Sequence, residues 1–191
     1  DAGTATLYLQ DPGGAFTERI ERLETADTPR SASLGDVNGD GRTDAVVGSA
    51  SRVSAYLREA TGNLLSAPAR TLSPGNGPFF VAMGDLTGDG RSDLIVLHTN
   101  SLSPSLTFPG ASVHVQDPSG EWHPEAQALI TGAGPSWADI GDLNGDGRND
   151  IVIVARSSST AEIYLQGADG TFPSRPSQEL EADGFPVWVE L

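Results

Sequence analysis

The nine residues Asp36-Val37-Asn38-Gly39-Asp40-Gly41-Arg42-Thr43-Asp44 decide the fold of this chain, because their pattern returns twice further on. The second copy is DLTGDGRSD at 85–93, and the third is DLNGDGRND at 142–150. All three copies place oxygen-bearing side chains at positions 1, 3, 5 and 9 and glycine at positions 4 and 6. Glycine adopts positive φ at little cost, so each copy can turn sharply.

This spacing of oxygen atoms predicts a calcium site in each loop. Ca²⁺ takes about six to eight oxygen ligands from carboxylates, amides and backbone carbonyls. The side chains at positions 1, 3, 5 and 9 and the carbonyl of the arginine at position 7 would supply them. The predicted ligands are Asp36, Asn38, Asp40, Arg42 and Asp44 in the first loop, Asp85, Thr87, Asp89, Arg91 and Asp93 in the second, and Asp142, Asn144, Asp146, Arg148 and Asp150 in the third.

Two other loop types share part of this pattern. An EF-hand loop begins in the same way, but it needs a glutamate at position 12 and a helix on each side. Position 12 is Val47, Val96 or Ile153, and the apolar, β-branched run after each loop is typical of a strand. A metal-free Asp/Gly turn is the other alternative. Three closely spaced aspartates in every copy speak against it, because carboxylates without a cation would repel one another.

The bulk composition narrows the classes of protein. The chain has 191 residues, no cysteine and a net charge of −15, which excludes disulfides and argues against nucleic acid or anionic membranes as partners. No apolar stretch approaches the roughly 20 residues of a membrane helix, so no membrane insertion is expected. The start at Asp1 without methionine is what a processed or excised segment would show. Calcium sites of extracellular modules are weak and fill outside cells, which predicts an extracellular or secreted location, with periplasm or cell surface also possible.

Two other sequence features recur together with the loops, one proline and one hairpin in each unit. A proline stands seven residues before each loop, and a hairpin glycine follows a ring residue at constant spacing in Tyr56…Gly62, His114…Gly120 and Tyr164…Gly170. A fourth copy of the hairpin, at 7–16, precedes the first loop. Each unit therefore reads as four strands, A to D, with the aspartate loop between A and B and the hairpin between C and D. Four-stranded units of roughly 50 residues are typical of β-propeller blades.

The chain resembles the FG-GAP/VCBS repeat family, the blades of integrin α-type β-propellers and of many bacterial secreted proteins. The D-x-[NT]-x-D-G-R-x-D loops carry this resemblance, which covers essentially the whole chain. It implies an all-β propeller of four-stranded antiparallel blades, structural Ca²⁺ at the three sites and a role in adhesion or ligand recognition. Thr87 departs from the commoner Asn or Asp, so we expect the second calcium site to be the weakest.

The repeat predicts one propeller domain with partial ends. We expect a partial blade with strands C and D at 1–28, blades at 29–77, 78–134 and 135–185, and the first strand of another blade at 186–191. Two interpretations stay open. The chain is a fragment of a larger propeller, typically seven-bladed in this family and completed by further blades of the parent chain or of another chain. Alternatively, it closes a small four-bladed ring that lacks one strand.

The family's layout places ligands on the face opposite the calcium loops, where the D–A turns lie. At one aligned position stand Ser31, Phe80, Trp137 and Trp188. The three aromatic residues Phe80, Trp137 and Trp188 are candidates for a platform that stacks on a sugar or a peptide side chain, and packing between blades is the alternative. The Ser- and Pro-rich loop 99–110 is either a second ligand-binding element or a tolerated insertion.

Catalysis has little support. His98, His114 and His123 are the only histidines, and His114 stands where the other hairpins have tyrosine. The sequence has neither G-x-S-x-G nor H-E-x-x-H. We therefore predict a non-enzymatic, secreted, calcium-stabilised module that recognises a glycan, as a lectin does, or an extracellular protein, as in cell adhesion. A passive scaffold part of a larger secreted assembly or enzyme is the alternative.

Overall fold

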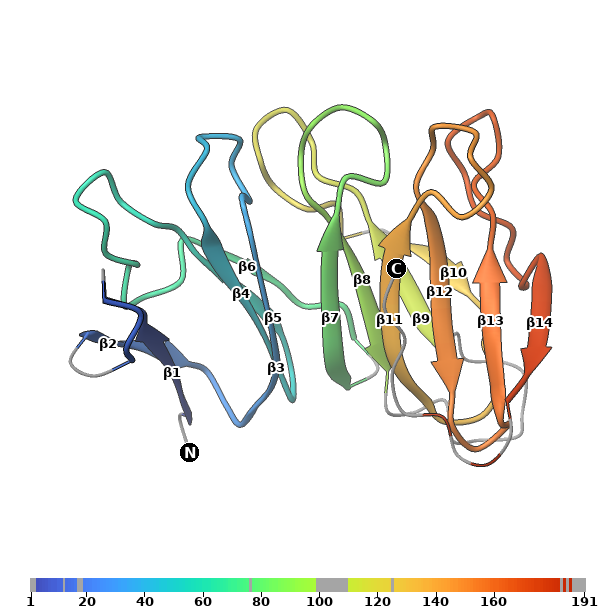
Figure 1. Cartoon of the computed structure of the whole chain (residues 1–191), viewed down its shortest axis with the longest axis horizontal. Helices are drawn as coiled ribbons and strands as arrows, with labels where there is room; N and C mark the ends of the chain where they lie inside the picture. Colours follow the sequence, from blue (N-terminus) through green and yellow to red (C-terminus); the bar gives the residue numbers. More distant parts are fainter. Residues whose placement is uncertain are drawn as a thin grey trace.

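The computed structural model describes residues 3–11, 13–16, 19–75, 77–98, 110–124, 126–182, 184 and 186. Over these residues the chain forms four antiparallel sheets without a helix (Figure 1). No helix in the described part could span a membrane. The four-stranded antiparallel units predicted from the repeat are confirmed in the last three sheets, which we name blades 1, 2 and 3; the two-stranded sheet before them is the half-blade.

The strands follow the chain in order, and every neighbouring pair in a sheet is consecutive in sequence. The half-blade contains β1 (Gly3–Leu9) and β2 (Arg19–Thr25). Blade 1 contains β3 (Pro29–Gly35), β4 (Asp44–Ser49), β5 (Val53–Tyr56) and β6 (Arg70–Leu72). Blade 2 contains β7 (Pro78–Gly84), β8 (Asp93–His98), β9 (Ala111–His114) and β10 (Gln127–Leu129). Blade 3 contains β11 (Pro135–Gly141), β12 (Asp150–Ala155), β13 (Thr160–Tyr164) and β14 (Gln178–Glu181).

The second strand of each blade is completely buried. Each of them, β4, β8 and β12, lies inside its sheet with a hydrogen-bonded strand on both sides. Their apolar, β-branched sequences suit such a place. The first strand of each blade starts at a proline and carries a register shift at once, between Pro29 and Ser31 in blade 1 and at the matching positions in blades 2 and 3. Proline cannot donate to the ladder, so it is confined to such edges and bulges.

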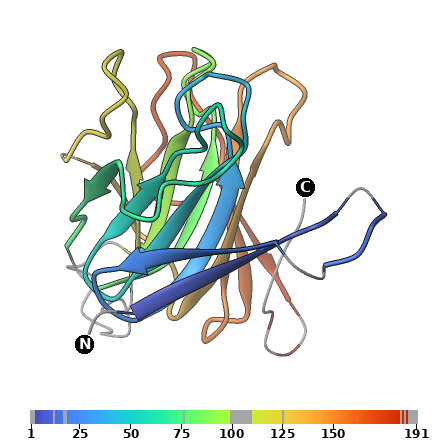
Figure 2. The same cartoon turned by 90° about the vertical axis from the view of Figure 1, so that its left-hand side faces the viewer.

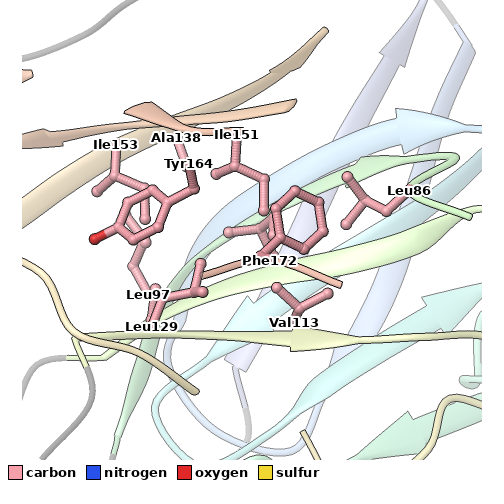
Figure 3. Packing of buried hydrophobic residues seen from close by; sticks show 11 residues of the cluster. Leu86, Leu97, Val113, Leu129, Ala138, Ile151, Ile153, Tyr164 and Phe172 are labelled. Carbon is pink, nitrogen blue, oxygen red and sulfur yellow. The ribbon is translucent and has the colours of Figure 1, made fainter. Parts of the chain in front are cut away.

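The core lies between consecutive sheets, which stack face to face. One cluster joins the half-blade to blade 1, a second joins blades 1 and 2, and a third joins blades 2 and 3. Figure 3 shows the third, where Ile153 and Tyr164 of blade 3 point at Leu97 and Leu129 of blade 2. Each full blade therefore has a front face toward the preceding sheet and a back face toward the following one.

The connections divide between the two sides of the arc. The aspartate loops after β3, β7 and β11 rise on the same side as the hairpins after β9 and β13 (Figure 1). The turns from β4 to β5 and from β12 to β13 lie on the opposite side. The first strands of adjacent blades are neighbours, since β3 contacts β7 and β7 contacts β11.

Candidate calcium loops and the opposite face

The aspartate at position 1 organises each loop through backbone hydrogen bonds. In the first loop the Asp36 carboxylate accepts from the N–H of Gly39 at 2.8 Å and of Gly41 at 2.7 Å, and the Asn38 side-chain oxygen accepts from the N–H of Asp40 at 3.1 Å. Burial works against the charged form of Asp36, but these backbone donors outweigh it and lower its pKa. The loop is therefore built around an ionised carboxylate.

The other two loops repeat this geometry. Asp85 accepts from Gly88 and Gly90 at 2.7 and 2.8 Å. The corresponding bonds of Asp142, to the N–H groups at 145 and 147, measure 2.7 and 2.9 Å. All six loop glycines have positive φ, and a Cβ at any of them would meet no atom within 4 Å. Glycine is required there by the backbone conformation and not by a lack of space.

The aspartate at position 9 ties the loop to the hairpin. Asp44 is fully buried, and its two oxygens accept from the N–H of Val37 at 2.9 Å and of Arg58 at 2.7 Å. Asp93 and Asp150 hold the same two positions in their blades. This carboxylate thus closes its own loop and fixes the loop against the start of the C–D hairpin.

Burial raises the pKa of two of these closing carboxylates, Asp44 and Asp93. It raises the pKa of Asp93 to about 6, the N–H of Gln116 opposes the rise, and repulsion by Asp89 adds to it. Burial likewise raises the pKa of Asp44. A cation in the loop would favour the charged form of both residues.

The arginine at position 7 uses its side chain as well as its backbone. Its guanidinium pairs with the aspartate at position 5 in every loop: Arg42 with Asp40, Arg91 with Asp89 and Arg148 with Asp146. Its Nε also donates to a hairpin carbonyl, at 2.9 Å from Arg42 to Arg58. One arginine against three aspartates leaves each loop with two negative charges.

The donor set of the loops fits calcium. It consists of hard carboxylate, amide, hydroxyl and carbonyl oxygens with a surplus of negative charge. As the described side chains stand, no three acidic or histidine residues gather closely enough to hold a metal, because Asp40 turns to Arg42 and Asp44 turns to backbone N–H groups. An ion would therefore replace the guanidinium at the position 5 carboxylate.

The structure reveals cross-blade hydrogen bonds that the sequence reasoning missed. Ser92, at position 8 of its loop, donates to the carbonyl of Asp36 in the preceding blade at 2.7 Å, and Gln116 donates to the carbonyl of Val37 at 2.9 Å. At the next junction Asn149 donates to Asp85 at 2.7 Å and Gln166 donates to Leu86. One signal could have found them: a small polar residue stands at position 8 of every loop, and glutamine recurs two residues after the ring residue of the hairpin.

On the opposite face, two of the predicted aromatic residues meet each other. The rings of Phe80 and Trp137 lie with their centroids 4.7 Å apart at an interplanar angle of 46°. At the aligned position in blade 1, Ser31 accepts from the N–H of Val81 at 3.1 Å. These contacts support the interpretation as packing between blades, yet Trp137 stays 37% exposed. Trp188 and residues 99–109 lie outside the described residues.

Two cavities open at blade junctions on the side of the β4–β5 and β12–β13 turns. One, of about 530 Å³, lies between the half-blade and blade 1 and is lined by Thr25, Arg52 and Ser54 among others. The other, of about 200 Å³, lies between blades 2 and 3 and includes Thr131 and Glu162. The strand registers make the two cavities equivalent in position. Both are lined by polar side chains that can exchange hydrogen bonds with a ligand.

At the junction of blades 1 and 2, a buried histidine pair takes the equivalent place. The Ser112 hydroxyl lies 2.8 Å from Nε2 of His98 and 3.0 Å from Nε2 of His114. Nδ1 of His114 donates to the carbonyl of His123 at 2.9 Å. The side chains of His98, His114 and Ser112 are all buried. His114 ends strand β9, as its alignment with tyrosine predicted.

Comparison with known proteins supports the repeat and the fold. The sequence pattern of the FG-GAP-like repeat matches residues 1–47, 36–96 and 142–191. No curated relative matches. Among solved structures, a Lactobacillus plantarum protein is similar over 97% of this chain and 51% of its own (TM-score 0.65, 16% identity). An Agrocybe aegerita lectin that recognises non-reducing terminal N-acetylglucosamine is similar over 79% and 38% (TM-score 0.55, 23% identity).

A third structure, a candidate 6-phosphogluconolactonase from Bacteroides fragilis, is similar over 94% of this chain and 45% of its own, with a TM-score of 0.56 and 16% identity. The chain thus spans about half the length of these three structures or less. At these identities the likeness shows the fold alone. That fold is an open arc of β-propeller blades, because the four sheets do not close into a ring over the described residues.

Proposed function

Because the chain belongs to the FG-GAP-like repeat family, we propose that it is a calcium-stabilised β-propeller module that recognises a glycan outside the cell. Calcium is structural in this proposal, and binding rather than catalysis is the activity. The observation that carries it is the difference in side-chain chemistry between the two sides of the arc. One side holds three equivalent acidic loops, and the other holds a half-exposed tryptophan on a phenylalanine and polar cavities at the junctions.

Calcium, when bound, would supply the positive charge that each loop lacks. Asp36, Asn38, Asp40 and the Arg42 carbonyl would hold it in the first loop, and the matching residues would do so in the other two. Asp44 would add the closing carboxylate while it keeps the loop against the hairpin. Weak sites of this kind fill at extracellular calcium concentrations, which supports a secreted location.

The ligand side suits a sugar for two reasons. The Trp137 ring, which is 37% exposed, offers apolar area to the C–H side of a sugar ring, and its contact with Phe80 fixes its orientation. The larger cavity offers a guanidinium from Arg52 and hydroxyls from Thr25 and Ser54. Nε of Arg52 is buried, and it has no hydrogen-bond partner in the part of the chain that is described. Hydroxyl-rich ligands satisfy such groups well.

A glycan array tests the proposal. The chain is applied in calcium and in chelator, and the array includes terminal N-acetylglucosamine, because one protein of similar fold recognises it. Binding of a defined sugar that Trp137→Ala removes, with an unchanged melting temperature, supports the proposal. No binding by folded, calcium-loaded chain overturns the glycan assignment and favours an extracellular protein as ligand.

A scaffold role is the second candidate, and the contact between Phe80 and Trp137 favours it. If that pair serves packing alone, Trp137→Ala lowers the melting temperature and leaves no binding activity to lose. Thermal melts of Trp137→Ala and Trp137→Phe distinguish the two roles, because phenylalanine keeps an aromatic contact with Phe80 but offers a smaller exposed face.

A further inference from the structure

The cavity between blades 2 and 3 contains a buried carboxylate. Glu162 of β13 is 2% exposed and lines this cavity, whereas the strand registers place Ser54 and Ser112 at the same position of blades 1 and 2. Figure 2 shows the β12–β13 turn, which also lines the cavity through Ser158, at the opposite end of the sheets from the aspartate loops. Blade 3 therefore carries an acidic group on the proposed ligand side of the arc.

A glycine of the preceding blade holds this carboxylate in place. Oε1 of Glu162 accepts a hydrogen bond from the N–H of Gly132 at 2.6 Å. A Cβ at position 132 would lie only 2.6 Å from the same oxygen, so the close approach of the carboxylate requires glycine there. The two blades together thus fix the position of the buried charge at their junction.

The second oxygen of the carboxylate, Oε2, has no hydrogen-bond donor left among the described residues. Its neighbour is the hydroxyl of Tyr164, at 3.3 Å. That hydroxyl has a single hydrogen, and the carbonyl of Ile130, at 2.8 Å, is the nearer acceptor. Oε2 therefore lies buried at the cavity with an unused capacity to accept, which is costly for a charged group.

A second carboxylate adds to the negative charge. Glu179 of β14 lies directly opposite Glu162 in the strand register and also lines the cavity. Burial raises the pKa of Glu162, the N–H of Gly132 opposes the rise, and repulsion by Glu179 adds to it. Arg175 is the basic residue of the lining, and no ion pair joins it to either carboxylate in the described part of the chain. Two carboxylates against one guanidinium leave one surplus negative charge.

We propose that this cavity binds a sugar that carries a free amino group, which rests on the glycan-binding function proposed above. The ammonium group of the sugar donates to Oε2 of Glu162 and cancels the surplus charge between Glu162 and Glu179. The cavity has a volume of about 200 Å³, below the roughly 300–1,000 Å³ of pockets that enclose drug-sized ligands. A single ring, free or at the end of a glycan chain, therefore fits it better than a longer segment.

Hydroxyl groups of the lining suit the rest of the ring. Thr131 donates to the carbonyl of Gly132 at 3.0 Å, so its oxygen can still accept a hydrogen bond. Ser158 accepts from the N–H of Ala133 at 2.6 Å, so its hydroxyl can still donate. The cavity thus offers one donor and one acceptor to sugar hydroxyls beside the acidic pair.

Titration of the chain with three monosaccharides, followed by the amide chemical shifts in NMR spectra, tests the proposal. D-Glucosamine, N-acetylglucosamine and glucose share one ring and differ at carbon 2, which carries an ammonium, an acetamide or a hydroxyl group. At about pH 6.5, where the amine is protonated, we expect D-glucosamine to bind about 10-fold or more tightly than the other two, as a hydrogen bond between charged groups contributes.

Variants assign the preference to the acidic pair. Glu162→Gln keeps the size of the side chain and an acceptor for Gly132 but removes the charge, so the preference for D-glucosamine should disappear. Glu179→Gln, at an exposed position, should reduce the preference several-fold without risk to the fold. The control Glu59→Gln removes one charge from the exposed β5–β6 hairpin and should leave all three affinities unchanged. Melting curves show that each variant is folded.

Equal affinities for D-glucosamine and N-acetylglucosamine overturn the inference, as does a preference that persists in both folded glutamine variants. Nα-acetyl-lysine amide offers an ammonium group without a sugar ring, and binding as tight as that of D-glucosamine would refute the amino-sugar assignment. If glycans on the array bind through Trp137 while D-glucosamine has no advantage, this inference alone fails. If neither the array nor any monosaccharide shows binding, the proposed function fails with it.

Discussion

The side-chain amide of Gln116 donates a 2.9 Å hydrogen bond to the carbonyl oxygen of Val37, which lies 79 positions earlier in the chain. Both residues are buried. Gln116→Ala should therefore leave a buried carbonyl without its donor and lower the free energy of unfolding by about 1–3 kcal/mol. Denaturant titration of the two proteins measures the difference.

A matched control for this prediction stands in the half-blade. Gln10 has the same place in its hairpin, but it donates to an exposed carbonyl, so Gln10→Ala should change the stability of the monomer by less than about 0.5 kcal/mol. Equal losses in the two variants would show that the cross-blade bond of Gln116 contributes nothing specific.

Asp40→Ala should lower the melting temperature in calcium and leave the melt in chelator nearly unchanged. At calcium 100-fold above Kd, an independent site contributes about 2.7 kcal/mol, whereas the exposed pair of Asp40 with Arg42 contributes at most about 1 kcal/mol. Scanning calorimetry in both buffers measures the two effects. The control Asp117→Ala lies in a hairpin outside the loops, and it should change the melting temperature by the same amount in calcium and in chelator. If Asp40→Ala behaves as Asp117→Ala does, the metal assignment at this loop is wrong.

Thr87→Asn should strengthen calcium binding at the second loop several-fold. The Asn144 oxygen at the same position accepts from the N–H of Asp146 at 2.9 Å and so is held in the loop; an amide oxygen is also a better ligand than a hydroxyl. Titration calorimetry can isolate this loop when Asp40→Ala and Asp146→Ala inactivate the others. Thr87→Val serves as the control and should bind more weakly still. An unchanged affinity in Thr87→Asn would refute the expected ranking of the sites.

His98 should make the chain less stable as the pH falls. Burial, with a smaller contribution from the neighbouring His114, lowers the pKa of His98 to about 4, and the Gly75 backbone opposes this shift. The unfolded state, with a pKa near 6.5, then binds the proton first. Stability is complete above about pH 6.5 and falls toward pH 4, by on the order of 3 kcal/mol at most.

Urea denaturation at several pH values checks this dependence. The control is His98→Gln, which keeps a polar, uncharged side chain next to Ser112. Because the carboxylates titrate alike in both proteins, the difference between the two curves isolates the histidine. Parallel curves from pH 7 to pH 4 would mean that His98 does not carry the dependence.

The repeat and its strands could be predicted because their signals are local. The glycines at positions 4 and 6 of each aspartate loop, such as Gly39 and Gly41, predict its turn. The apolar run after each loop predicts the fully buried strands β4, β8 and β12. The D strands give much less signal. β6 and β10 have three residues each, and β14 contains a single leucine, so alternation has no room to appear.

The cross-blade contacts could not be predicted in the same way, because their partners are far apart in sequence. Nothing near Gln116 specifies that its acceptor is Val37. The pairing of Arg42 with Asp40 was missed for another reason: the loop pattern assigned Arg42 a role through its carbonyl only. The contact between Phe80 and Trp137 arises because β7 and β11 are neighbours, and the local sequence does not specify that neighbourhood.

Of the four described sheets, only blade 2 has a complete four-stranded blade on each side. Stability in a row of such units is the sum of each unit and its contacts with nearest neighbours. Opening should therefore start at the two ends and reach β8 last. Amide hydrogens of Ile95 and Val96 should exchange with solvent at the slowest, global rate, and those of β1 and β14 far sooner. In thermodynamic terms the molecule is a short zipper, whose resistance to unfolding grows with the number of blades in the row.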